Sequence, residues 1–274
     1  MNNNELYHYG IKGMKWGVRK KYYKSHMDND RVLKKGTTIQ NISTNEKRDL
    51  TKNTPVYGSH TENDKNAYSG YYANNITAWG NKAIKNTIEL TQDVKIASQK
   101  VAVETFMDMY KKDPVGVSES ISNAYADLDW FHGIPKIRDY NAERISKKFS
   151  KKGEDWVKQK GYLMFNQSMM AETNKARNEY YKILLEKGYN AISDINDVQS
   201  GYNTEDPLIF INPKQTLKNV ESRELTFDEI KLANARYHYD QAVKNRTIVN
   251  DIIYQDYKIA KKELNRIEKK QGLK

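Results

Sequence analysis

An α+β fold is predicted for this chain by three observations. Short runs rich in β-branched residues alternate with turn residues in the first 100 residues. Helical four-and-three spacing dominates the later part of the chain. The last 49 residues begin with a capping sequence and contain no Pro or Gly before Gly272. We therefore expect a small mixed sheet covered by helices, a long C-terminal helix and an irregular N-terminal docking arm.

The expected elements follow one another in a definite order. Strands are predicted near residues 37–42, 56–59, 87–91, 94–97, 189–195 and 208–211, with a short helix within 64–76. A helix is predicted over 98–112, because Asp113-Pro114 ends it, and a longer one over 157–187 with Gly188 as its left-handed cap. Thr226 to Glu229 form a capping box before the last helical stretch, in which a break near 241–247 is expected.

The domain boundaries expected from these patterns are an N-terminal docking arm over 1–30, an α+β domain over 31–225 and a C-terminal helical segment over 226–274. The sequence has no cysteine, so disulfides and thiolate metal sites are excluded. No apolar stretch approaches the roughly 20 residues of a membrane helix, and no membrane partner is expected. The five histidines show no paired ligand spacing, so no metal site is predicted, and Asp206 is interpreted as a turn residue.

The net charge of +11 is concentrated at the two ends. Residues 1–35 carry nine Lys or Arg against three Asp or Glu, and residues 231–274 carry eleven against five. The remainder of the chain is close to neutral. Basic termini of this kind are compatible with contact to nucleic acid, and equally with a solvated helix and arm.

Residues 8–19 read HYGIKGMKWGVR and form the most specific motif in the chain. Its glycines permit tight turns, and Trp16 offers one large apolar anchor among cationic side chains. The residues expected to bind a partner are Gly10, Gly13, Met14, Trp16, Gly17 and Arg19. The motif resembles a short tag carried by phage and prophage head-associated proteins of low-GC bacteria.

That resemblance implies a non-enzymatic phage virion protein, which docks to capsid or portal proteins through its N-terminal arm. It also implies residence in the virion, and in the host bacterial cytoplasm during assembly or after delivery. An N-terminal strand that packs on its own domain remains the alternative interpretation of the motif.

A second resemblance concerns the body of the chain. The segments at 33–43, 56–61 and 188–212 are similar to the scaffold of ADP-ribosyltransferases. This likeness implies NAD as cofactor, Ser59 and Thr61 in the pocket floor, and Glu205 as the catalytic carboxylate beside the developing oxocarbenium ion. The first strand has Gln40 and Asn41 where that family has Arg or His. The alternatives kept open are thus a transferase-like effector using NAD and a DNA-associated basic protein.

Overall fold

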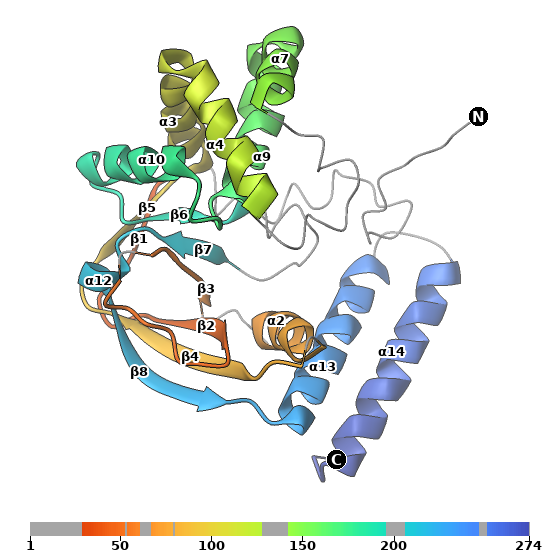
Figure 1. Cartoon of the computed structure of the whole chain (residues 1–274). Coiled ribbons are helices and arrows are strands. Elements are labelled where there is room, and N and C mark those ends of the chain that lie inside the picture. The colour runs from red at the N-terminus through yellow and green to blue at the C-terminus, as the bar shows by residue number, and fades with distance from the viewer. Residues whose placement is uncertain are drawn as a thin grey trace. The chain divides into compact units, whose positions relative to one another are not determined.

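The computed structural model describes residues 29–52, 54–60, 67–78, 80–127, 142–195, 206–246 and 251–273. The chain divides into two compact units. Within the described residues, unit 1 comprises 34–93 and 206–273, and unit 2 comprises 29–33 and 94–195. Both contain helices and strands, so the predicted α+β class is confirmed (Figure 1).

Unit 1 is built on five strands in the order β7-β3-β2-β4-β8, each antiparallel to its neighbour. Their bounds are β2 Thr38–Thr44, β3 Val56–His60, β4 Ala83–Leu90, β7 Pro207–Phe210 and β8 Leu217–Glu224. A β-bulge between Thr87 and Ile88 shifts the β4–β8 register, and both strands curve there (Figure 1). The short helix α12, Pro213–Thr216, precedes β8.

One face of this sheet is covered by α2, Ala67–Ala78, and by the first turns of α13, Phe227–Arg246. The apolar cluster between them comprises Ile42, Ala73, Ala83, Leu225 and Ile230. Residues from both ends of unit 1's sequence therefore meet in one core.

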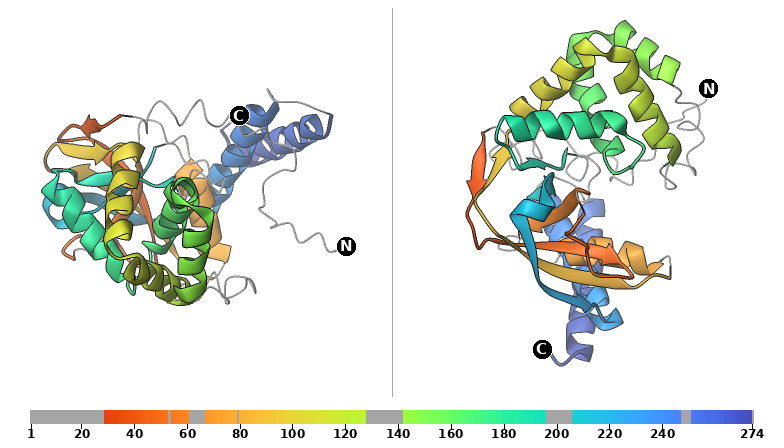
Figure 2. Two further views of the ribbon diagram at one scale, coloured as in Figure 1. Left: turned by 90° about the horizontal axis from the view of Figure 1, so that it is seen from above. Right: turned by 60° about the vertical axis from the view of Figure 1, so that its left-hand side comes forward.

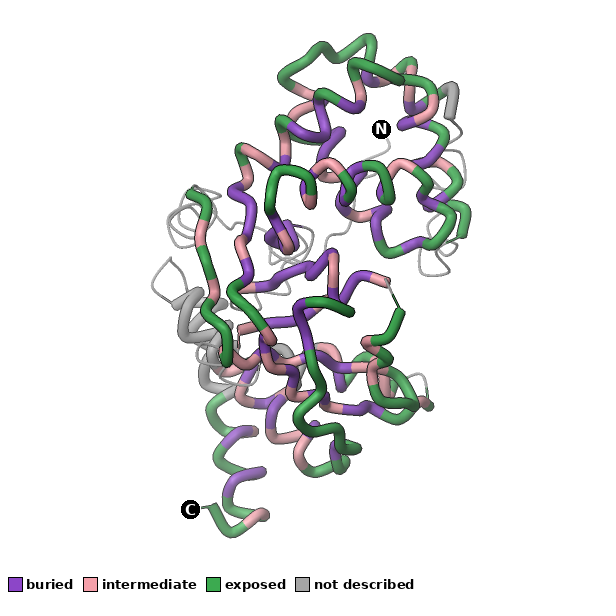
Figure 3. The backbone as a smooth tube through the Cα atoms, turned by 90° about the vertical axis from the view of Figure 1, so that its left-hand side faces the viewer, coloured by how far each residue is buried: buried purple, intermediate pink, exposed green. Residues whose placement is uncertain are grey.

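The C-terminal region is helical, as predicted, and consists of two 20-residue helices, α13 and α14, the latter spanning Asp251–Lys270. They lie side by side in two views (Figures 1 and 2) and share a cluster of Ala235, Leu264 and Ile267. Buried and exposed turns alternate along α14 beside the C-terminus (Figure 3). The first helix ends at Arg246, within the interval where the sequence predicts a break.

Unit 2 contains three short strands in the order β1-β5-β6: Arg31–Leu33, Val94–Ala97 and Ala191–Ser193. β5 and β6 are parallel, which makes the strand content mixed, as expected. The eight strands of the described residues exceed the small sheet predicted from the sequence. The helices of unit 2 are α3 Gln99–Lys112, α4 Pro114–Asp127, α7 Ala142–Lys152, α8 Glu154–Trp156, the π-helical turn η1 Val157–Gly161, α9 Tyr162–Ser168 and α10 Lys175–Glu186.

An aromatic core holds these helices together. Phe106 stacks on Phe165 at 5.1 Å between ring centroids, and Phe165 meets Tyr180 edge-on at the same distance. The buried hydroxyls of Tyr162 and Tyr180 lie 3.3 Å apart, and that of Tyr180 donates to the Ala102 carbonyl. Burial raises the pKa of both phenols, so both stay neutral at physiological pH.

The continuous helix predicted over 157–187 is wrong, because the chain turns between Ser168 and Lys175. Asn174 caps α10 by accepting from the Arg177 amide, and it donates to the Ser168 hydroxyl. The Arg177 guanidinium donates to the carbonyls of Met169 and Ala171. Side chains thus satisfy the backbone groups that the interruption exposes, which helical periodicity alone does not reveal.

Candidate functional site

Of the residues predicted for the transferase-like site, Ser59 lies near one end of three adjacent strands. Ser59 lies on β3 and is fully buried. It pairs with Gln40 of β2 on one side and with Pro207 of β7 on the other. Thr61 and Glu205 lie outside the described residues, but each adjoins this row in sequence. The register therefore brings the neighbours of Thr61 and Glu205 together across β3 and β7.

The close approach of β2 and β3 depends on Gly58. A Cβ at this position would lie 2.9 Å from the Gln40 carbonyl oxygen, a distance that real Cβ atoms do not tolerate. The glycine before Ser59 is thus required by packing between the two strands, and this requirement fixes Ser59 opposite Gln40.

The structure adds a contact between two residues that the sequence did not bring together. The Nδ1 atom of His60 lies 4.0 Å from Oδ2 of Asp206, and the two side chains are only 12% and 9% exposed. Asp206 has a φ of 50°, so it turns the chain directly before β7. His60 pairs with Ile39 across the strands. The pair has an ionisable ring and a carboxylate beside the strand end that carries Ser59, an arrangement able to orient an imidazole.

The sequence signal for this pair was weak. His60 and Asp206 are 146 residues apart in the chain, and only the pairing of β3 with β7 joins them. Neither a ligand spacing nor a catalytic motif marks them, so long-range strand pairing was the missing information.

Asn41, the second neutral residue of the first strand, belongs to a polar network on the sheet of unit 1. Its Oδ1 accepts from Asn86 Nδ2, and its own Nδ2 donates to the Tyr57 carbonyl. The Asn86 Oδ1 accepts from the Arg48 amide and from the Ser222 hydroxyl. Asn86 is fully buried, so the network stabilises the sheet and engages both polar atoms of the Asn41 side chain.

The point at which the predicted arm joins the described structure is held by Asp30. Its carboxylate accepts from the Tyr189 hydroxyl and from the Ser98 amide, and the Lys95 ammonium lies 3.9 Å away. The hydrogen bond to Asp30 raises the pKa of Tyr189 to about 12. Together with the pairing of β1 to β5, these contacts anchor the beginning of the described chain to unit 2.

The six partner-binding residues of the arm, Gly10 to Arg19, lie outside the described residues. Over the described ranges, no group of three His, Cys, Asp or Glu side chains is arranged to hold a metal ion. Among the helices described, none is both long enough and apolar enough to cross a membrane.

The comparisons with known proteins concern the arm. A family of unknown function, DUF7211, matches residues 1–22 of this chain. The match begins and ends within the predicted arm and covers none of the described residues. Curated proteins and solved structures gave no match. The chain is thus similar to a family of unknown function at its N-terminus. For the rest of the chain, function is inferred from its own residues and their contacts.

Proposed function

We propose that the protein is a non-enzymatic accessory protein of a phage head, which docks to capsid or portal proteins through its N-terminal arm. The observation that carries the proposal is the motif at residues 8–19, with Trp16 between glycines and cations. A rigid aromatic anchor with cationic neighbours is the composition of an interface hot spot.

One further observation supports this role. Asp30, the last residue of the predicted arm, accepts hydrogen bonds from Tyr189 and Ser98 of unit 2, and the β1–β5 pairing follows directly after it. A partner bound by the arm would therefore carry the folded body with it.

The experiment that tests the proposal is incorporation into particles during infection or induced assembly. We expect deletion of residues 1–20 to abolish co-purification with heads, and Trp16→Ala to reduce it at least tenfold, because one buried tryptophan commonly contributes 2 kcal/mol or more of interface free energy. Phe227→Ala, which removes an exposed aromatic side chain from the body, is the matched control and should incorporate normally. Unchanged incorporation of the deletion variant would refute the docking role.

A second candidate function, transfer of ADP-ribose from NAD, is favoured by one observation. The register across β2, β3 and β7 aligns Gln40, Ser59 and Pro207, and Pro207 follows the expected catalytic residue Glu205 by two positions in the sequence. The neutral Gln40 and Asn41 do not fit the cationic grip expected for dinucleotide phosphates, because an amide lacks the charge-assisted contact of arginine. For this reason the transferase is placed second.

Incubation of the purified chain with labelled NAD and host lysate distinguishes the two functions. The docking proposal predicts no label transfer. Transfer that is lost in Glu205→Ala and retained in Glu224→Ala, an exposed carboxylate of β8, would establish the transferase instead.

A further inference from the structure

Helix α7 of unit 2 is strongly basic, although the middle of the sequence is close to neutral when its charges are summed. Its eleven residues contain five cations against one acid, Glu143. The cations Arg144, Lys147, Lys148, Lys151 and Lys152 are spaced i, i+3, i+4, i+7 and i+8. Residues with this spacing share one face of an α-helix, so they form a continuous stripe about 12 Å long.

An adjoining face of α7 packs into the interior of unit 2. Ile145 and Phe149 are 0% and 1% exposed. The Phe149 ring meets those of Tyr110 and Trp156 edge-on, at 5.4 and 5.7 Å between centroids. Because its apolar side chains are already buried, α7 offers a partner charge without a hydrophobic face, unlike helices that insert into a membrane surface.

One acid next to α7 is engaged by lysines outside this stripe. Glu154, two residues after the helix, accepts from both Lys111 and Lys158, at 3.1 and 3.0 Å. The hydrogen bond from Lys158 is the main cause of its lowered pKa. Within the described ranges, no carboxylate lies within ion-pair distance of Lys147, Lys151 or Lys152, and all three are exposed. Lys148 lies over the Trp156 ring, 5.3 Å from its centroid.

We propose that this cationic stripe on α7 binds the phosphate backbone of double-stranded DNA without reading its sequence. Duplex DNA carries one negative charge per roughly 1.7 Å of axis, so a 12 Å stripe faces about seven phosphate charges. Four of the five cations are lysines, which act as point charges on phosphates rather than as planar forks for base edges. The Trp156 ring beside the stripe packs edge-on against Phe149 and lies under Lys148, which disfavours the base stacking that single strands require.

The inference is independent of docking through the arm, since α7 belongs to unit 2 and the arm is left unchanged in the test. Binding of a labelled 30-base-pair duplex by the full chain is measured by fluorescence anisotropy, in steps between about 50 and 200 mM KCl. The test variant is Lys147→Gln/Lys151→Gln/Lys152→Gln. The matched control, Lys262→Gln/Lys269→Gln/Lys270→Gln, removes the same charge from exposed positions of α14.

Loss of three phosphate contacts should weaken binding by the test variant on the order of a hundredfold near 0.1 M salt, and should reduce the slope of log K against log salt by about 2 to 3. The control variant should change the affinity by less than threefold, and replacement of the same three α7 lysines by arginine should preserve binding. Thermal unfolding checks that all variants remain folded.

Three outcomes would overturn the proposal: no binding by the wild-type chain, equal weakening by the two triple variants, or equal binding of the α7 variant and the wild type. Vesicles containing phosphatidylserine and a 30-nucleotide single strand serve as competitors. Displacement of the duplex by either one more effectively than by unlabelled duplex also counts against it, because the stripe would then be selective for another polyanion.

Discussion

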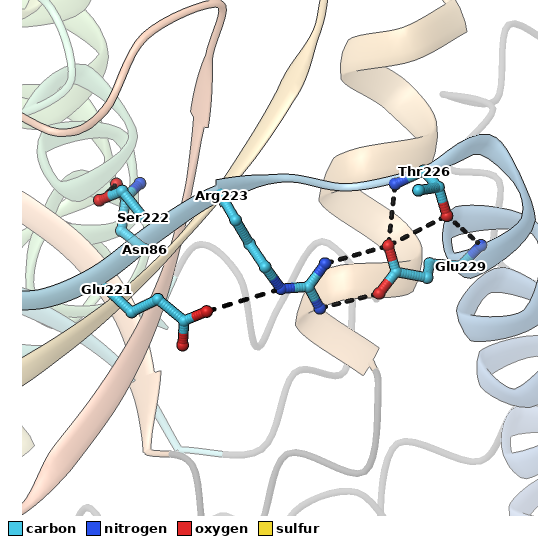
Figure 4. A network of polar contacts seen from close by, with 6 residues as sticks. All are labelled: Asn86, Glu221, Ser222, Arg223, Thr226 and Glu229. Atoms are coloured by element: carbon cyan, nitrogen blue, oxygen red, sulfur yellow. Dashed lines mark hydrogen bonds and ion pairs between the residues drawn. The ribbon is translucent and has the colours of Figure 1, made fainter.

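Asn86 shows how one side chain can hold several strands of unit 1 in register. Its amide group bonds to Asn41 and Ser43 of β2, and its carbonyl oxygen accepts from Ser222 of β8 and from the Arg48 amide (Figure 4 shows Asn86 with Ser222). In a fully buried position, each lost partner leaves a polar group without compensation.

We expect Asn86→Ala to destabilise the protein by about 2–4 kcal/mol, because Asn41 Oδ1 loses a buried donor and the part-buried Arg48 amide and Ser222 hydroxyl lose their acceptor. Ser222→Ala, which removes one peripheral donor, should cost about 1 kcal/mol. Urea unfolding followed by circular dichroism measures both. Equal effects of the two substitutions would show that Asn86 is not the centre of the network.

Tyr189 provides a second prediction at the scale of one residue. Tyr189→Phe removes the hydrogen bond to Asp30 and should cost about 1–2 kcal/mol at pH 7, since the acceptor is charged. The pKa of Tyr189 is raised to about 12 in the folded protein, above the ordinary value of 10. The contribution of the Tyr189–Asp30 hydrogen bond to the free energy of unfolding is therefore fully present at pH 7 to 10 and is lost as the pH rises from 10 through 12.

The measurement is the difference in unfolding free energy between wild type and Tyr189→Phe across this pH range. Tyr181→Phe is the control, because the buried Tyr181 hydroxyl has no hydrogen-bond partner among the described residues. Its removal should be neutral or slightly stabilising. A difference for Tyr189→Phe that does not shrink above pH 10 would argue against the Asp30 contact.

Among the elements, the start of α13 is the one that the sequence defined most completely. The Thr226 hydroxyl accepts from the Glu229 amide, and Glu229 accepts from the Thr226 amide, as the capping box predicts (Figure 4). The structure adds Arg223 of β8, which contacts both carboxylate oxygens of Glu229 at 3.0 and 2.8 Å. The Arg223 hydrogen bond lowers the pKa of Glu229 to about 2.

A depressed carboxyl pKa gives this cap a defined dependence on pH. We expect Thr226→Ala to cost about 1 kcal/mol, and Glu229→Gln to cost less than about 1 kcal/mol because the pair is exposed and glutamine retains the cap. The difference in unfolding free energy between wild type and Glu229→Gln should be fully present above pH 4.5 and should vanish as the pH falls through 2. Acid unfolding curves provide the measurement, and Glu221→Gln, whose carboxylate lies 4.0 Å from Arg223, should follow the wild type.

Prediction from sequence succeeded where the signal is local and failed where it is long-range. The helix α3 and the left-handed Gly188 were predicted from neighbouring residues and are confirmed, whereas the Ser98 cap of α3 comes from the structure. The strand β8 was missed because seven of its eight residues are exposed, and all of these except Val220 are polar. They show no alternation of apolar and polar residues, so pairing with β4 decides the conformation of this segment. The pair His60 and Asp206 was missed for the same reason, since β3–β7 pairing creates it.

At the scale of the molecule, the two units have separate apolar cores. Ile230 belongs to the cluster beneath α2 and α13 in unit 1, and Phe165 belongs to the aromatic core of unit 2. We expect Ile230→Ala and Phe165→Ala each to cost about 2–5 kcal/mol, as large-to-small changes in a core do. Because opening is local to a cooperative unit, each variant should lose protection chiefly in its own unit.

Native-state hydrogen exchange by mass spectrometry tests this division, with each variant serving as the control for the other. Ile230→Ala should increase exchange in β2, β4 and β8, and Phe165→Ala in α3, α9 and α10. Equal acceleration in both sets of segments for either variant would show that the protein unfolds as one unit.

The discontinuity of unit 1 has a consequence for biosynthesis. Strands β2 and β4 leave the ribosome before residues 94–195 of unit 2, whereas Leu225 and Ile230, which close the core beside Ile42, are translated some 135 residues after Leu90. At bacterial elongation rates this interval is on the order of ten seconds. The nascent half-sheet must wait that long for its last strand and helix, so ribosome-bound chains should depend on chaperones most strongly in this interval.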